Sequence, residues 1–126
     1  MNKTFYWLKI KKDFFNSILI KKMRKSENGN AMAIVYLKMQ LEAVENEGII
    51  PFLGYGEDIV EEISLNIDEE ISIVKNTLDF LAKYGMASLE ETQLFLPETL
   101  KNTEKETDAA ERMRRMRERR EGDKNV

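Results

Sequence analysis

The segment from Glu57 to Pro97 is the part of this sequence that most restricts the fold. Apolar residues recur there at helical spacing in two runs, and a polar turn at residues 66–68 separates these runs. Gly85 ends the second run, and two short strand-like runs then flank residues 90–92. This order of helix, turn, helix and hairpin predicts a winged helix-turn-helix.

The sequence before this segment adds a strand and two helices. The aromatic-rich run Phe5–Lys11 predicts a strand, and a short helix is expected over Ile18–Lys25. A longer helix is expected to have Asn30 as its N-cap and to end at Gly48. Its apolar residues are widely spread, which indicates burial on most sides. Four of them form the predicted principal stripe: Ile34, Leu37, Leu41 and Val44.

The predicted fold class is mainly α with a small β component. We assign residues 1–97 to the winged-helix domain, which includes the N-terminal strand. Apolar residues almost vanish between residues 98 and 108, so this stretch is predicted to be a linker. Residues 109–126 form a basic, arginine-rich tail that is expected to be flexible, either helical or disordered.

Composition excludes several classes of function. The chain contains no cysteine and no histidine, so a disulfide framework and a Cys/His zinc site are excluded. It has no glycine-rich phosphate loop and no nucleophile motif, so we expect no enzymatic activity, no metal, no cofactor and no small-molecule substrate. No apolar run approaches the roughly 20 residues that span a bilayer, so no membrane partner is expected and the predicted location is the cytoplasm.

The net charge of −3 conceals three regions of different sign. Residues 1–25 contain eight basic groups and one acidic group. Residues 26–110 contain five basic and eighteen acidic groups, whereas residues 111–126 contain seven basic and four acidic groups. Because local fields steer a polyanion such as DNA, the two basic regions are candidates for phosphate contacts.

Several stretches together resemble a known family: FYWLKIKKDFF, AIVYLKMQLEAVENEG, EDIVEEISLNIDEEISIVKNTLDFLAKYG and AAERMRRMRER. They are similar to the N-terminal domain of phage replisome organisers, which are related in fold to the DnaD-like primosomal proteins of Gram-positive bacteria. The resemblance implies a self-associating winged-helix domain that acts in replication initiation in a bacterial host cell, with a helicase or helicase loader as a further candidate partner. Longer members continue into a second domain, so this chain is expected to be a short member or a part of such a protein.

The second helix of the predicted turn motif carries two candidates for DNA contact, Lys75 and Asn76. In ordinary docking this helix lies in the major groove, where such side chains reach base edges or phosphates. Three acidic residues lie on or near the same surface: Glu69, Glu70 and Asp79. Because these residues and the acidic wing tip, Glu90 and Glu91, repel phosphate, sequence-specific readout by this helix is disfavoured.

The basic residues near the N-terminus are stronger candidates for phosphate contact. They are Lys9, Lys11, Lys12, Lys21, Lys22, Arg24 and Lys25. Each phosphate contact releases counterions and adds a salt-dependent increment to the affinity. However, lysines on an edge strand also prevent aggregation, and lysines near a helix C-terminus complement its dipole. The sequence leaves both interpretations open.

The tail contains six arginines: Arg112, Arg114, Arg115, Arg117, Arg119 and Arg120. Their forked side chains suit phosphate, and arginine-rich segments often fold on binding nucleic acid. The alternative is a soluble tether in which arginines pair with Glu111 and Glu118 at helical spacing. We favour nucleic acid, because the arginines outnumber those that two ion pairs would use.

Phe5, Tyr6 and Trp7 are the predicted self-association site. With Phe14 and Phe15 they place many aromatic rings in a short stretch, more than a small domain is expected to bury alone. A stacking platform for single-stranded DNA is the alternative. Burial in a core or an interface is favoured, because it is the commoner use of such residues.

Together these features predict a DNA-binding, self-associating protein of replication initiation, of phage or plasmid origin. A sequence-specific transcription regulator and a pure oligomerisation module are the alternatives. Preference for one DNA sequence would indicate the regulator, and the absence of any DNA binding would indicate the module.

Overall fold

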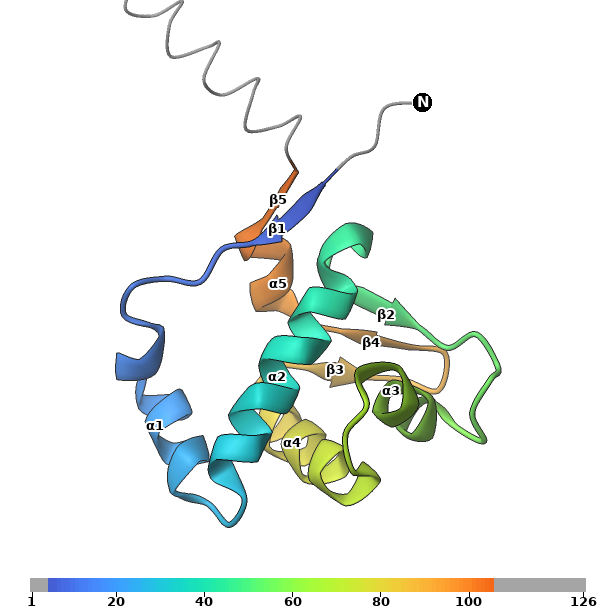
Figure 1. The fold of residues 1–126 in the computed structure, drawn as a ribbon, viewed down its shortest axis with the longest axis horizontal. Helices are drawn as coiled ribbons and strands as arrows, with labels where there is room; N and C mark the ends of the chain where they lie inside the picture. Colours follow the sequence, from blue (N-terminus) through green and yellow to red (C-terminus); the bar gives the residue numbers. More distant parts are fainter. Residues whose placement is uncertain (1–4, 106–126) are drawn as a thin grey trace, which may run out of the picture.

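The computed structural model describes residues 5–105. The fold is mainly helical with a small β component, as predicted, and the η elements are single turns of 3-10 helix (Figure 1). In chain order the elements are β1 (Tyr6–Leu8), η1 (Phe14–Asn16), α1 (Ile18–Lys25), α2 (Gly29–Ala43), η2 (Val44–Asn46), β2 (Ile49–Pro51), α3 (Ile59–Ile67), α4 (Ile71–Lys83), β3 (Ser88–Leu89), β4 (Gln93–Phe95), α5 (Pro97–Asn102) and β5 (Thr103–Lys105).

Helix α2 is the centre of the core, with contacts to α1, α3 and α4 (Figure 1). Val35 and Met39 of α2 are fully buried, as are Val74 and Leu81 of α4. Leu94 of β4 is also fully buried, so the sheet closes the same core. The core therefore fixes α4 against α2 and leaves the other side of α4 to solvent.

The predicted principal stripe of α2 is wrong. Ile34 and Leu41 are more than half exposed, whereas Val35, Tyr36 and Met39 are buried. Every side of this helix carries apolar residues, so their spacing alone does not show which side meets α1 and α4.

Helix α2 begins at Gly29, so Asn30 lies inside the helix. The prediction that Asn30 is the N-cap is wrong. A Cβ atom at Gly29 would lie 2.3 Å from the carbonyl oxygen of Met23, so only glycine lets the end of α1 approach this closely. Asn30 instead accepts a hydrogen bond from Nε of Arg24 at 3.0 Å. The tight corner between α1 and α2 thus replaces a side-chain cap.

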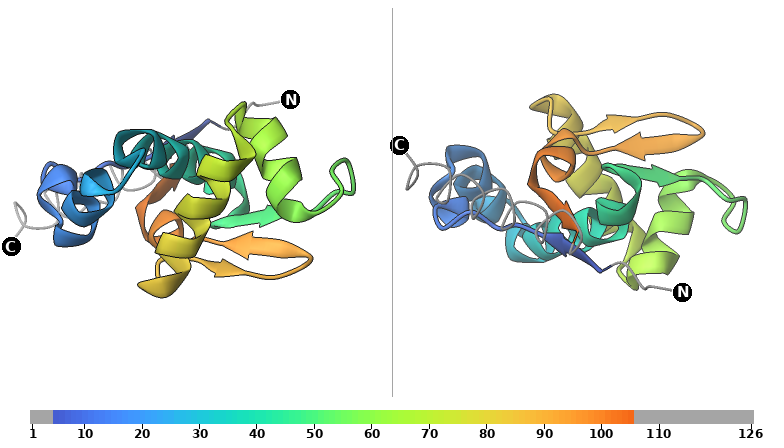
Figure 2. Two further views of the ribbon diagram at one scale, coloured as in Figure 1. Left: turned by 90° about the horizontal axis from the view of Figure 1, so that it is seen from below. Right: turned by 90° about the horizontal axis from the view of Figure 1, so that it is seen from above.

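The predicted hairpin is confirmed, and it forms part of a larger sheet. Strands β2, β4 and β3 form a three-stranded antiparallel sheet in that order. Pro51 lies in β2, an edge strand, where a residue without an N–H group is tolerated. The hairpin turns at residues 90–92, and its loop lies at the end of the molecule opposite α1 (Figure 2).

The predicted linker is wrong over its described part. Pro97 occupies the first turn of α5, where its fixed backbone angle suits a helix, and the next three residues after α5 form β5. β5 pairs antiparallel with β1, with Leu8 opposite Thr103. The Thr99 side chain is buried, and its hydroxyl donates to Oε1 of Gln40 at 3.3 Å. The folded domain therefore extends beyond the predicted boundary at residue 97.

Candidate nucleic-acid interface

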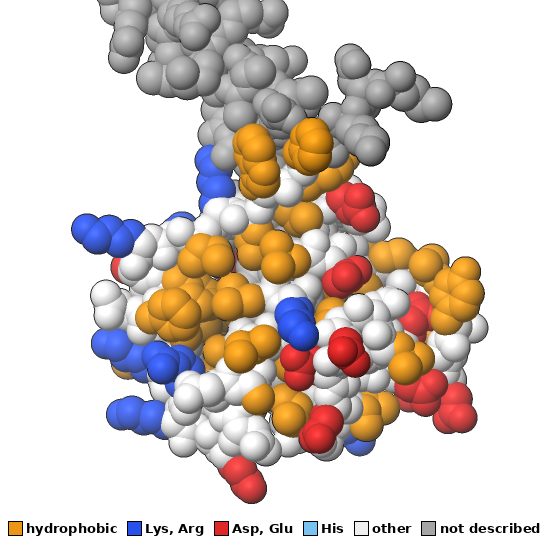
Figure 3. All heavy atoms as spheres, in the orientation of Figure 1, with side chains coloured by type: hydrophobic (Ala, Val, Ile, Leu, Met, Phe, Trp, Pro, Cys, Tyr) orange, Lys and Arg blue, Asp and Glu red, His pale blue; other side chains and the backbone are white. Residues whose placement is uncertain are grey.

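Helix α1 presents a row of exposed basic side chains because its apolar side is buried. Ile20 and Met23 face the core, which leaves the basic residues of the helix outside. Lys and Arg side chains gather along the α1 side of the molecule, and Asp and Glu side chains gather on the opposite side (Figure 3). The exposed basic residues of α1 are Lys21, Lys22, Arg24 and Lys25.

Arg24 has structural contacts as well as a charge. Besides its hydrogen bond to Asn30, its guanidinium lies 5.4 Å from the centre of the Phe15 ring. The hydrogen bond and the ring hold the side chain at the corner between α1 and α2. Lys21 and Lys25 are therefore the more adaptable candidates for phosphate contact on α1.

Tyr84 joins α1 to the C-terminal end of α4. The Nζ atom of Lys22 lies 5.2 Å from the centre of the Tyr84 ring, and that of Lys83 lies 5.5 Å from it. The pKa of Tyr84 is lowered, first by hydrogen bonding to Lys22 and then by the charges of Lys22 and Lys83. Basic residues from two helices thus share one positive surface, which we call the α1–α4 basic surface.

Lys75 and Asn76 are exposed on the outer side of α4, as predicted. Lys75, Asp79 and Lys83 follow one another at four-residue spacing, so Lys75 lies about 12 Å along the helix from Lys83. The exposed Asp79 carboxylate interrupts the positive charge between them. The structure therefore brings Lys83, rather than Lys75, to the lysines of α1.

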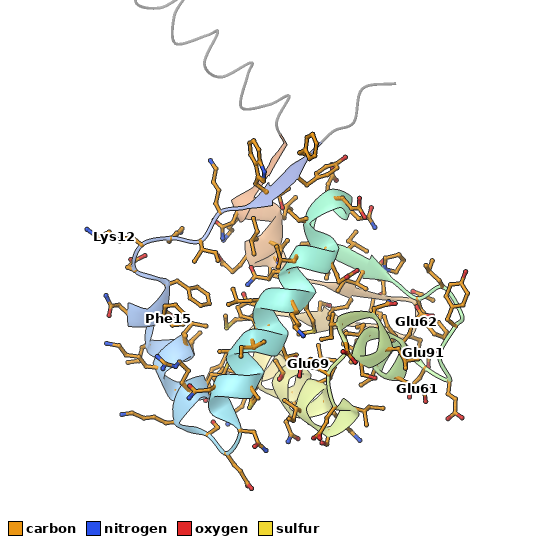
Figure 4. The ribbon with its side chains drawn as sticks, viewed as in Figure 1. Lys12, Phe15, Glu61, Glu62, Glu69 and Glu91 are labelled. Carbon is orange, nitrogen blue, oxygen red and sulfur yellow. The ribbon has the colours of Figure 1, made fainter. Side chains whose placement is uncertain are left out.

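Lys9, Lys11 and Lys12 lie between β1 and η1. The predicted strand continues to Lys11, but β1 ends at Leu8. β1 covers the residues opposite β5, and one further backbone hydrogen bond, from the Lys9 N–H to the Asn102 carbonyl at 2.7 Å, follows it. Lys9 and Lys11 line a groove, whereas Lys12 points away from the body of the molecule (Figure 4).

This groove has a volume of about 500 Å³ and lies between the segment after β1, helices α2 and α5, and the end of α4. We call it the α2 groove. Its polar lining includes Tyr36, Gln40 and Glu98. Burial raises the pKa of Tyr36 to about 12, and the charge of Glu98 contributes to the rise. Sequence reasoning missed these residues, because Tyr36 and Gln40 lie within an apolar helix.

The opposite end of the molecule is acidic. Glu90 and Glu91 are exposed at the tip of the β3–β4 hairpin, as predicted. Glu61 and Glu91 lie on the same side of the molecule, far from Lys12 (Figure 4). In ordinary winged-helix docking the hairpin faces the phosphates of a duplex, which would repel the carboxylates of Glu90 and Glu91. The α1–α4 basic surface, not the hairpin, is therefore the candidate for contact with phosphates.

Lys38 of α2 binds the turn between α3 and α4. Its Nζ atom donates to the Ile67 carbonyl at 3.0 Å and to Oε1 of Glu69 at 2.8 Å. Asp68, in the predicted turn at residues 66–68, ends α3 in the left-handed conformation, with φ of 56°. Asparagine and aspartate tolerate that conformation better than most residues. Lys38 thus offsets one of the acidic charges beside α4.

Glu62 is a buried carboxylate that organises the loop before α3. It accepts hydrogen bonds from the backbone N–H groups of Leu53 at 2.7 Å, Tyr55 at 2.5 Å and Gly56 at 3.3 Å. The bond from Leu53 is the largest cause of a lowered pKa at Glu62, and burial opposes it. These bonds give Glu62 a structural role in holding the loop before α3.

The predicted self-association residues lie in β1 (Tyr6 and Trp7) and immediately before it (Phe5). Phe5 and Trp7 are about half exposed, whereas Tyr6 is partly buried. Hydrophobic side chains are exposed at the end of the molecule that contains β1 (Figure 3). Within residues 5–105, β1 pairs only with β5, so this strand pair is separate from the three-stranded sheet.

Several predictions concern residues outside this surface. The arginines of the tail, Arg112 to Arg120, lie outside the described residues. Residues 5–105 contain no cluster of acidic side chains arranged to hold a metal ion. In the same part of the chain, no helix is long and apolar enough to cross a membrane.

Comparison with known proteins identifies a family. The family model for the N-terminal phage replisome organiser matches residues 7–125, which is almost the entire chain. No curated protein and no solved structure shows a significant match. The chain therefore belongs to the family of N-terminal phage replisome organiser domains.

Proposed function

We propose that this domain binds DNA through the α1–α4 basic surface during the initiation of phage DNA replication. Membership of the replisome organiser family supports the replication-related role. The observation that carries the proposed DNA contact is that Lys22 of α1 and Lys83 of α4 both lie against the Tyr84 ring. Two helices together supply the positive field that attracts phosphate.

In the proposed docking mode, α1 takes the place that the wing has in an ordinary winged helix. The acidic hairpin would turn away from the duplex, and α4 would approach it by its C-terminal end. Asp79 and the hairpin charges favour contact with phosphates over readout of bases. This supports sequence-independent binding rather than the transcription-regulator alternative.

We further propose that copies of the domain associate through β1, and that the protein acts by assembly, not by catalysis, in the cytoplasm of the bacterial host. Exposed Phe5 and Trp7 support the association, because large aromatic side chains dominate the energy of many interfaces. Bound copies would then offer a combined surface to a helicase or helicase loader.

The test of DNA binding is a titration of labelled duplexes of unrelated sequence with the whole chain, followed by fluorescence anisotropy. Similar affinities for all sequences, with strong salt dependence, are expected. Tight binding confined to one sequence would support a transcription regulator instead. No binding to any duplex would support a pure oligomerisation module.

Deletion of residues 111–126 tests the tail. The deletion removes seven basic and four acidic groups, which moves the net charge from −3 to −6. The cut follows β5, so the described fold should remain. If the tail contacts phosphates, the slope of log affinity against log salt should fall by about 0.9 for each lost contact. An unchanged slope would show that the tail is a tether.

Replacement of Phe5 and Trp7 by alanine tests self-association. The dissociation constant measured by analytical ultracentrifugation should rise roughly tenfold or more, because truncated aromatic anchors at an interface have large effects. Tyr55→Ala is the control, since Tyr55 is 84% exposed and lies in a different loop. A wild-type chain that stays monomeric at every concentration would contradict the proposal.

A further inference from the structure

Two buried polar groups lie at the α2 groove without complete hydrogen bonding. Tyr36 is only 2% exposed, and among the described residues its hydroxyl has no hydrogen-bond partner. Gln40 is 4% exposed, and its oxygen accepts from Thr99 while its amide nitrogen has no partner in the described region. Within this region no fully enclosed side-chain nitrogen or oxygen lacks a partner, so both groups meet solvent, and both line the groove.

The walls of the groove are aromatic and apolar. The rings of Phe14 and Tyr36 are stacked with centroids 6.5 Å apart, and Leu37 and Met86 are among the apolar residues that also line the groove. The volume of about 500 Å³ lies within the range of small-ligand sites, roughly 300–1,000 Å³. The groove can therefore hold one planar group the size of a nucleobase.

Charged groups surround this apolar slot. Lys9 and Lys11 are exposed and line the groove on the side of the segment after β1. Tyr84 lines it at the end of α4 and also contacts Lys22 of the α1–α4 basic surface. A nucleic-acid strand on that surface thus passes directly beside the opening of the groove.

We propose that the α2 groove receives an unpaired nucleotide of single-stranded DNA. The donors of Tyr36 and Gln40 would meet carbonyl oxygens of the base, and the Glu98 carboxylate would accept from a base N–H group. The nearby lysines would bind the flanking phosphates. This inference rests on the proposed DNA binding, and it adds strandedness to it, because a paired base cannot enter the groove.

A peptide is the other class of ligand that such a groove could hold. The lysines would suit the carboxylates of an acidic peptide as well as phosphates, and Asp13 and Glu98, which also line the groove, oppose either negative group, so charge alone does not separate the two ligands. The combination of donors, an acceptor and aromatic walls matches the edge and faces of a base more closely. We therefore assign the groove to the nucleotide.

The test compares labelled oligothymidylate with a duplex of the same length, using the whole chain and anisotropy. Oligothymidylate should bind more tightly. Tyr36→Phe should weaken its binding roughly two- to tenfold, as expected for one lost hydrogen bond, and leave duplex binding unchanged. Thermal unfolding should not change, because the lost hydroxyl has no partner in the described fold. Tyr55→Phe, outside the groove, is the matched control.

Leu37→Trp is a second variant, which fills the groove and should also weaken only single-strand binding. Equal affinity for both DNA forms, or no effect of either groove variant, would overturn this inference while duplex binding still supported the proposed function. Absence of binding to both DNA forms would overturn both proposals. Two further results would overturn it. The first is that free thymidine monophosphate competes as effectively as the strand does. The second is that the methyl resonances of Leu37 shift with an acidic peptide but not with oligothymidylate.

Discussion

Replacing Lys21, Lys22 and Lys25 by glutamine should reduce the affinity for duplex DNA on the order of 100-fold at about 0.1 M salt, if each lysine contacts one phosphate. These side chains are exposed on α1. The amino groups of Lys22 and Lys83 both lie over the ring of Tyr84. The slope of log affinity against log salt should fall by about 0.9 for each lost contact. Anisotropy titrations over a range of salt concentrations measure both quantities.

Lys101→Gln is the matched control for this triple variant. Lys101 is exposed on α5, and its ion pair with Glu98 at 3.5 Å is too exposed to contribute much to stability. It lies outside the α1–α4 basic surface, so its loss should change the affinity little. An effect of this single change as large as one third of the triple effect, in logarithmic units, would show that net charge, not position, governs binding.

The Glu62→Gln variant should unfold at a clearly lower temperature than the native protein. The buried carboxylate accepts three backbone N–H groups from the loop before α3, and an amide replaces one acceptor oxygen by a donor. Buried donors without a partner are costly, so the loop should loosen. Circular dichroism melting measures the change, with Glu91→Gln at the exposed hairpin tip as control.

The same variant should alter the response to acid. The folded-state pKa of Glu62 is lowered from its ordinary value of 4.5, so the carboxylate stabilises the fold above that value. This stabilisation is lost as the pH falls through the lowered pKa. Glu62→Gln should therefore lose less stability between neutral and acid pH than the native protein does. An equal loss in both would contradict the structural role of Glu62.

Much of the domain from α3 to β4 can be predicted from sequence because local signals define it. Asp58 caps α3 by accepting from the N–H of Glu61 at 2.9 Å, and Gly85 adopts positive φ at the end of α4. Residues 98–105 lack such signals, since few of them are apolar. Their order depends on pairing with β1 and on the contact between Thr99 and Gln40, which are distant in sequence.

The candidate site could be predicted only in part for the same reason. Charge counting identifies the lysines of α1, because they lie close together in the sequence. Their meeting with Lys83 at Tyr84 depends on the packing of α1 and α4 around α2. Lys38 and Glu69 likewise form an ion pair across 31 residues of sequence. No local pattern predicts which of two distant charges will meet.

The most direct test of the proposed interface is a spectrum of backbone amide resonances of the whole chain during titration with duplex DNA. The proposed interface predicts that the largest shifts occur in α1 and at Lys83 and Tyr84, and that residues 90–92 of the hairpin change little. Shifts centred on the hairpin loop and the start of α3, with α1 unchanged, would contradict it.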